Sequence, residues 1–132
     1  MKRTLLAFVA AGLLLWSLTA CGGGEEPAVA FCSALSELNE TAPTIAALGE
    51  AATLAQIVQL GAAMDNNWQD LSRATEGMDD TTQAVFAPYD EQYTAIPAIT
   101  QQAAMPVARA SLEAKSTIVT AAYDALYAGR CQ

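Results

Sequence analysis

Apolar residues recur at steps of one, three and four through the middle of this sequence, and this spacing is the strongest constraint on its fold. It places an apolar stripe along one face of a helix. Thr53 precedes the stripe as a candidate N-cap and Gly77 follows it, so the pattern predicts a helix from about 53 to 77. The stripe consists of Leu54, Ile57, Val58, Gly61, Met64, Trp68 and Leu71, and Asp65, Asn66, Asp70 and Arg73 are expected on other faces.

Two further segments show the same spacing near the two ends of the domain. The earlier one runs from about 28 to 49, and we expect Pro43 to kink it or divide it in two. The later one begins at Pro106, which suits the first turn of a helix. Gly129 is expected just beyond its last helical residue, beside Arg130.

A third helix is predicted between these, capped by Asp79 or Asp80. Its apolar positions extend to Ile96 and Ile99 and include two prolines, Pro88 and Pro97, so it should be kinked or broken. No strand alternation, hairpin signal or internal repeat competes with these helices. The sequence therefore predicts an all-α domain over 28–132, an up-down four-helix bundle with some helices kinked by proline.

The first residues have the layout of a bacterial secretory signal. Lys2 and Arg3 are followed by an uncharged run over 5–16, which is too short for a comfortable membrane span. The run ends at Leu18-Thr19-Ala20-Cys21, which resembles the lipobox of bacterial lipoproteins. The resemblance implies removal of a signal peptide over 1–20 and a diacylglycerol on Cys21. An ordinary cleaved signal and an uncleaved membrane helix are the alternatives.

This resemblance also implies a location and a membrane partner. The protein would be exported and lipid-anchored to the cell membrane or envelope through Cys21, facing outside the cytoplasm. Residues 21–27, with three glycines, would form a short tether that holds the domain close to the bilayer. The Phe31-Cys32 pair and the late Cys131 are also similar to small helical lipoproteins of high-GC Gram-positive bacteria, and this second resemblance implies no activity.

Cys32 lies one turn inside the first predicted helix, and Cys131 comes just after the last one. In an exported protein such a pair predicts a disulfide. An even number of antiparallel helices also brings both chain ends to one end of the bundle, so four helices place these cysteines close together. Two free thiols or an intermolecular bond are the alternatives.

Composition excludes several functions. The sequence contains no histidine, which removes the commonest general base, most zinc ligand sets and the usual catalytic triads. Loss of Lys2 and Arg3 with the signal takes the formal charge from −8 to about −10, which disfavours nucleic-acid binding. We therefore expect no enzyme activity, no metal and no cofactor.

A few side chains are candidates for a site. The pairs Asp79/Asp80 and Asp90/Glu91 match no calcium loop and more often cap helices or face solvent. Tyrosines recur at helical spacing as Tyr89/Tyr93 and Tyr123/Tyr127. Residues of this type are usually core packing, but they can also line a ligand pocket. The candidate ligand-binding residues are Trp68, Phe86, Tyr89 and Tyr93.

Two functional hypotheses follow. The first is a non-catalytic cell-envelope lipoprotein whose helical surface binds a protein or an envelope component. The second is a carrier that holds a small apolar ligand or a lipid within the bundle. The first expects a packed interior, and the second expects a cavity at the candidate ligand-binding residues.

Overall fold

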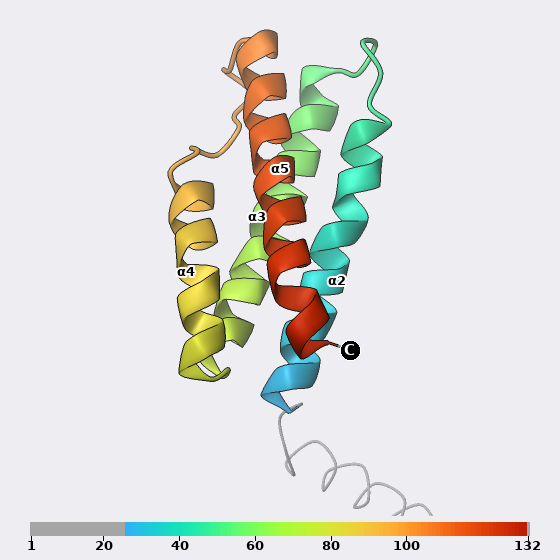
Figure 1. Ribbon diagram of the computed structural model, residues 1–132. Coiled ribbons are helices and arrows are strands. Elements are labelled where there is room, and N and C mark those ends of the chain that lie inside the picture. The colour runs from blue at the N-terminus through green and yellow to red at the C-terminus, as the bar shows by residue number, and fades with distance from the viewer. Residues whose placement is uncertain (1–25, 132) are drawn as a thin grey trace, which may run out of the picture.

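The computed structural model describes residues 26–131. They form helices α2 (Pro27–Ala46), α3 (Leu54–Glu76), α4 (Asp80–Thr94) and α5 (Met105–Arg130), and this part of the chain contains no strand. The four helices alternate in direction along the long axis of the bundle (Figure 1). This confirms the all-α, up-down four-helix bundle. The proposed signal peptide and Cys21 lie outside the described residues.

Local capping sets the start of two helices, as expected. The side chain of Thr53 accepts a hydrogen bond from the backbone N–H of Gln56, and the Gln56 side chain accepts one from the Thr53 N–H. This reciprocal pair satisfies two donors that a helix start leaves free. Asp79 caps α4 in a related way, since its carboxylate accepts from the backbone N–H of Thr82.

Two prolines lie inside helices that remain single elements, whereas the sequence predicted kinks or breaks at these residues. Pro27 already belongs to α2, and Pro43 lies in the final turns of this helix, which ends at Ala46 instead of near 49. Helix α4 runs through Pro88 as one element and ends at Thr94, before Pro97. The proline cannot donate the backbone bond that a continuing helix needs there.

Two expected helix positions are therefore wrong. Ile96 and Ile99 belong to an irregular connection over 95–104, where both side chains are half-buried and Ile99 packs against the core. Gly129 lies inside the last turn of α5, and Cys131 occupies the position that caps the helix. Because the last turn remains regular through Gly129, no glycine is needed to end it.

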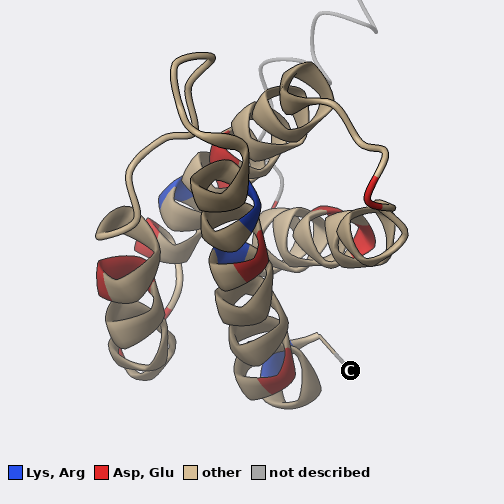
Figure 2. Ribbon diagram, turned by 90° about the horizontal axis from the view of Figure 1, so that it is seen from above, with Lys and Arg blue, Asp and Glu red and all other residues tan. Residues whose placement is uncertain are grey.

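Helices α3 and α5 form the centre of the bundle. They contact each other, and each also contacts both α2 and α4, while α2 and α4 lie on opposite sides without touching (Figures 1 and 2). The core draws on the inner faces of all four helices. Its large buried side chains are Phe31, Leu35, Leu38, Ile45, Ile57, Met64, Trp68, Leu71, Phe86, Tyr93, Leu112, Val119 and Leu126.

Arg109 closes the end of the bundle where α2 passes to α3. Its Nη2 atom donates to the backbone carbonyl oxygens of Gly49 and Glu50 at 3.0 Å and of Ala52 at 3.3 Å. These carbonyls belong to the connection between the two helices, where Gly49 O also accepts a hydrogen bond from the backbone N–H of Ala52 at 3.1 Å. One arginine on α5 thus adds a donor for three carbonyls of a loop that has few backbone hydrogen bonds of its own.

A disulfide joins Cys32 to Cys131, with the two Cα atoms 5.6 Å apart and a sequence separation of 99. This confirms the predicted pairing. It ties the first turns of α2 to the end of α5, at the end of the bundle where the described chain both begins and finishes (Figure 1). Within the described residues, no helix is both long enough and apolar enough to cross a membrane.

Removal of this disulfide should lower stability through the unfolded state. We expect Cys131→Ser, made in a Cys21→Ser chain so that no third thiol exchanges, to lose about 4 kcal/mol of unfolding free energy, the value for closing a loop of this length. Urea unfolding followed by circular dichroism measures the change. The parent chain should show the same loss once a reductant is added. Equal midpoints for variant and parent in oxidising buffer would contradict this assignment.

Candidate functional site

Three of the four candidate ligand-binding residues come together between α3 and α4. The rings of Trp68 and Tyr93 are nearly parallel, with an interplanar angle of 4° and centroids 4.2 Å apart. Phe86 lies 5.4 Å from Trp68 on the same helix as Tyr93. All three side chains are buried. Tyr89 is half-buried against the core and stacks on none of them.

The polar edge of the indole is satisfied from α4. Trp68 Nε1 donates to Asp90 Oδ1 at 2.8 Å. Asp90 precedes Tyr93 by three residues, so both project from one face of α4 toward α3. A buried tryptophan needs such an acceptor, because its N–H would otherwise lose a hydrogen bond to water.

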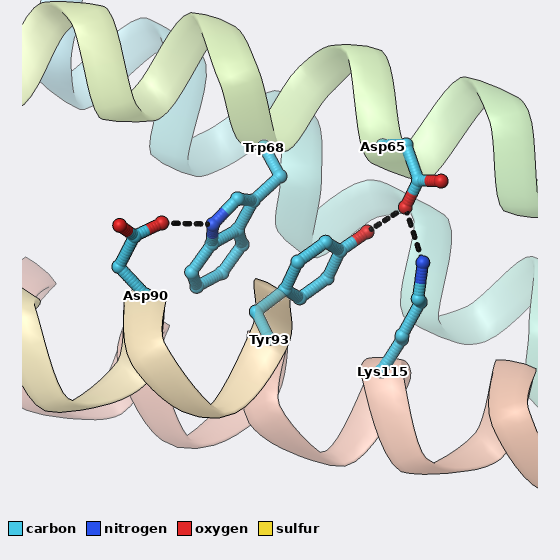
Figure 3. Close-up of polar contacts among 5 residues, drawn as sticks. All are labelled: Asp65, Trp68, Asp90, Tyr93 and Lys115. Carbon is cyan, nitrogen blue, oxygen red and sulfur yellow. Dashed lines mark hydrogen bonds and ion pairs between the residues drawn. The ribbon is translucent and has the colours of Figure 1, made fainter. Parts of the chain in front are cut away.

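The most unusual residue of the site is Lys115 on α5, whose side chain is only 2% exposed. Its Nζ atom lies 2.7 Å from Asp65 Oδ1 on α3 and 4.9 Å from the ring centre of Tyr93. The Tyr93 hydroxyl donates to the same Asp65 oxygen at 2.7 Å. Three helices thus meet at one carboxylate oxygen (Figure 3). We name Asp65, Trp68, Asp90, Tyr93 and Lys115 the polar cluster.

Burial and charge act together within the polar cluster. A lysine withdrawn from water is tolerated only beside an opposite charge, and the Tyr93 ring adds a favourable face for a cation. Burial, and then the hydrogen bond to Asp65, raise the pKa of the Tyr93 hydroxyl far above its usual range. Tyr93 therefore remains a neutral donor at physiological pH.

A groove opens beside the polar cluster. We name it the Lys115 groove; its cavity volume is about 190 Å³. Ile99 holds the connection over 95–104 against α3, since a Cβ atom on Gly61 would lie 3.0 Å from Ile99 Cδ1. This close approach places one wall of the groove. The lining residues are Asp65, Trp68, Gln69, Tyr93, Thr94, Ile96, Ala98 and Lys115.

A wider and more open hollow of about 500 Å³ lies beside the disulfide, between α2 and α5. Its lining includes Val29, Tyr127 and Arg130. The Arg130 Nε atom donates to Thr82 Oγ1 at 2.7 Å, which links α5 to α4. The hollow beside the disulfide contains no buried charged residue. Among residues 26–131 the one buried charged side chain is that of Lys115, and it lines the smaller groove. We therefore take that groove as the candidate site.

One residue of each acidic pair has a structural partner. Asp79 caps α4, and the backbone N–H of Thr82 lowers the pKa of its carboxyl group. Asp90 binds Trp68, whereas Asp80 and Glu91 face solvent. Within residues 26–131, no three acidic or cysteine side chains are grouped so that they could hold a metal ion.

Sequence reasoning missed Asp65 and Lys115 as members of the site. Asp65 was expected on an outer face, but it lies half-buried at the edge of the α3 stripe. Lys115 carried a recognisable signal, because it occupies a core position of α5 at helical spacing from Leu112 and Val119. A charged residue on such a stripe indicates a buried ion pair.

The two partners of this ion pair should respond unequally to mutation. Asp65→Ala leaves the buried Lys115 ammonium without its carboxylate, and we expect a loss of about 3 kcal/mol in unfolding free energy. Lys115→Met keeps the apolar stem and leaves Asp65 bonded to Tyr93, so the loss should be smaller. Asp70→Ala is the matched control on α3, since it breaks an exposed pair with Arg73 worth at most about 1 kcal/mol. Equal losses for Asp65→Ala and Asp70→Ala in urea unfolding would contradict this account.

The Tyr93 hydroxyl should make stability fall in alkaline solution. Its native pKa is raised, so its contribution is complete below the unfolded tyrosine pKa of about 10 and declines as pH rises above that value. Tyr93→Phe should lose about 1.5 kcal/mol at pH 7, because the hydrogen bond to a carboxylate is gone. The gap between parent and variant should then narrow between about pH 10 and 11. Parallel pH profiles in urea unfolding would show that Tyr93 is not the group responsible.

Comparisons with known proteins found no relative of this chain. No protein-family model matches the chain, and neither the curated proteins nor the solved structures contain a match to it.

Proposed function

We propose that this chain is a non-catalytic cell-envelope lipoprotein whose helical domain binds a protein or an envelope component at the membrane surface. Three features support the proposal: the lipobox-like residues before Cys21, the closure of both chain ends by one disulfide, and the packed interior. The packed interior is the observation that favours a surface-binding role over a carrier with a ligand inside the bundle.

Filling of the interior argues for a surface role. A carrier of a lipid or apolar ligand needs a cavity between the helices, and Trp68, Phe86, Tyr89 and Tyr93 were the candidates to line it. Instead, Trp68 packs against both Phe86 and Tyr93. The Trp68 indole N–H donates to Asp90, and the Tyr93 hydroxyl donates to Asp65. A buried aromatic stack with its polar edges satisfied supports a rigid core. The carrier hypothesis remains the alternative.

The position of the first described residues supports attachment through Cys21. Helix α2 begins at Pro27, at the same end of the bundle as Cys131 (Figure 1). A flexible tether of about six residues spans roughly 13 Å. A lipid on Cys21 would therefore hold the disulfide end near the bilayer and direct the connections over 47–53 and 95–104 away from it.

Charge limits the partners that this surface can take. Each basic residue after the signal is already engaged within the domain: Arg73 with Asp70, Arg109 with loop carbonyls, Lys115 with Asp65, and Arg130 with Thr82. The remaining carboxylates are mostly exposed, and Figure 2 shows acidic residues on the helices and on a connection between them. Such a surface repels nucleic acids and anionic headgroups, so the proposed partner is neutral or basic.

Mass spectrometry of the protein purified from its own membranes tests this proposal. Under denaturing conditions, we expect a diacylglycerol on the peptide that begins at Cys21, together with the two-hydrogen deficit of the Cys32–Cys131 bond. Under native conditions, the domain should carry no apolar molecule inside the bundle. A discrete apolar adduct that survives transfer to the gas phase would favour the carrier alternative.

Two serine variants provide the matched control. Cys21→Ser should leave the membrane fraction or accumulate as the unprocessed precursor. Cys131→Ser should remain lipidated and membrane-bound, because the disulfide plays no part in attachment. A mature Cys21→Ser protein that still sediments with membranes would remove the anchor from the proposal.

A further inference from the structure

We propose that the Lys115 groove binds a neutral molecule with two adjacent hydroxyl groups, as carried by a single sugar ring. The inference deepens the proposed function, because it names the class of envelope component that the domain takes, and it rests on that function only for the natural source of the sugar. The residues that carry it are the buried Lys115 and the half-buried Asp65.

Lys115 supplies the donor. An ammonium group has three N–H bonds, and among residues 26–131 the Nζ atom has one hydrogen-bond acceptor, Asp65 Oδ1 at 2.7 Å. The Tyr93 ring lies on another side of the ammonium. Lys115 is 2% exposed and borders the groove, so a donor that points there is largely shielded from bulk water. A ligand oxygen in the groove would satisfy it.

Asp65 supplies the acceptor. Its Oδ1 atom already receives hydrogen bonds from Lys115 and Tyr93, while Oδ2 receives none from the described residues and points away from both donors (Figure 3). The Asp65 side chain is 25% exposed and lines the groove. One hydroxyl can therefore donate to Asp65 while its neighbour accepts from Lys115. A pair of adjacent hydroxyls matches a directly bonded ammonium and carboxylate.

The charges at the groove select a neutral ligand. Lys115 and Asp65 compensate each other, so no net charge attracts an ion. An anion that approached Lys115 would meet the carboxylate of Asp65, and a cation that approached Asp65 would meet the ammonium. Hydroxyl groups avoid both penalties, because each can donate or accept as the neighbouring side chain requires.

The remaining walls and the volume suit one ring. Ile96 and Ala98 provide apolar contact for the C–H face of a sugar, and Gln69 and Thr94 add polar groups at the rim. The volume of about 190 Å³ is below the roughly 300–1,000 Å³ of sites for larger ligands. The groove therefore fits a terminal sugar of an envelope glycan better than an internal unit of a chain.

Trp68 provides a direct reporter. The chain has two tryptophans, Trp16 and Trp68, so a Trp16→Phe chain reports on the groove alone, whether or not the signal is cleaved. The purified full chain, in a detergent without a sugar headgroup, is titrated with the methyl glycosides of mannose, galactose and arabinose to about 50 mM, since few net hydrogen bonds give millimolar affinity. At least one neutral glycoside should produce a saturable change in Trp68 emission. Glucuronate and glucosamine should bind at least about tenfold more weakly.

Replacing either of two alanines in the 95–104 connection by phenylalanine distinguishes an effect on ligand binding in the groove from an effect on folding. Ala98→Phe places a ring in the groove without altering the ion pair, and should weaken binding at least about tenfold. Ala95→Phe is the matched control, since this exposed residue does not line the groove, and its binding should equal that of the parent. Circular dichroism should show the same helix content for both.

Three results would overturn the inference: no saturable response to any neutral glycoside, equal binding of the charged sugars, or parental binding by Ala98→Phe. These outcomes are independent of attachment. A chain that binds glycosides but carries no lipid on Cys21 keeps the groove and loses the anchor, whereas a lipidated chain that ignores every glycoside keeps the anchor and loses the groove.

Discussion

The arrangement of three helices depends on an ammonium group that is kept from water. Lys115 is tolerated inside the bundle because Asp65 lies at hydrogen-bond distance on α3 and Tyr93 on α4 adds both a ring face and a hydroxyl to the same carboxylate. A slide of α5 by one turn, about 5.4 Å, would separate these groups and leave a charge unpaired. The contact therefore favours one register of α3, α4 and α5 over those in which the ammonium would lack its carboxylate.

Much of the fold could be predicted because its signals are local or topological. The caps at Thr53 and Asp79 depend on residues three positions apart, and an even number of helices brings Cys32 and Cys131 together. Errors arose where periodicity continued beyond the helix. Ile96 and Ile99 keep the apolar spacing of α4, yet the chain around Pro97 is irregular and buries parts of both side chains from a connection instead.

The candidate site was predictable only in its apolar half. Trp68, Phe86 and Tyr93 follow apolar stripes, so their meeting in the core could be anticipated. Their polar partners could not be predicted from the sequence. Asp65 and Lys115 are separated by 50 residues, and Trp68 and Asp90 are separated by 22. Which side chains meet across such intervals depends on the relative rotation and slide of packed helices, and no local pattern records these. Lys115 on a core stripe showed that some partner was required, but not which one.

The disulfide also changes what damage to the domain can do. Residues 32 and 131 enclose most of α2 and all of α3, α4 and α5, together with the connections over 47–53, 77–79 and 95–104. A protease that cuts any one of these connections opens the chain but sheds no fragment, because both pieces stay joined through sulfur and through their buried faces. In the proposed location outside the cytoplasm, where thiol reductants are scarce, a nicked molecule would remain one particle. Release of a fragment would require two cuts or a cut together with reduction of the disulfide.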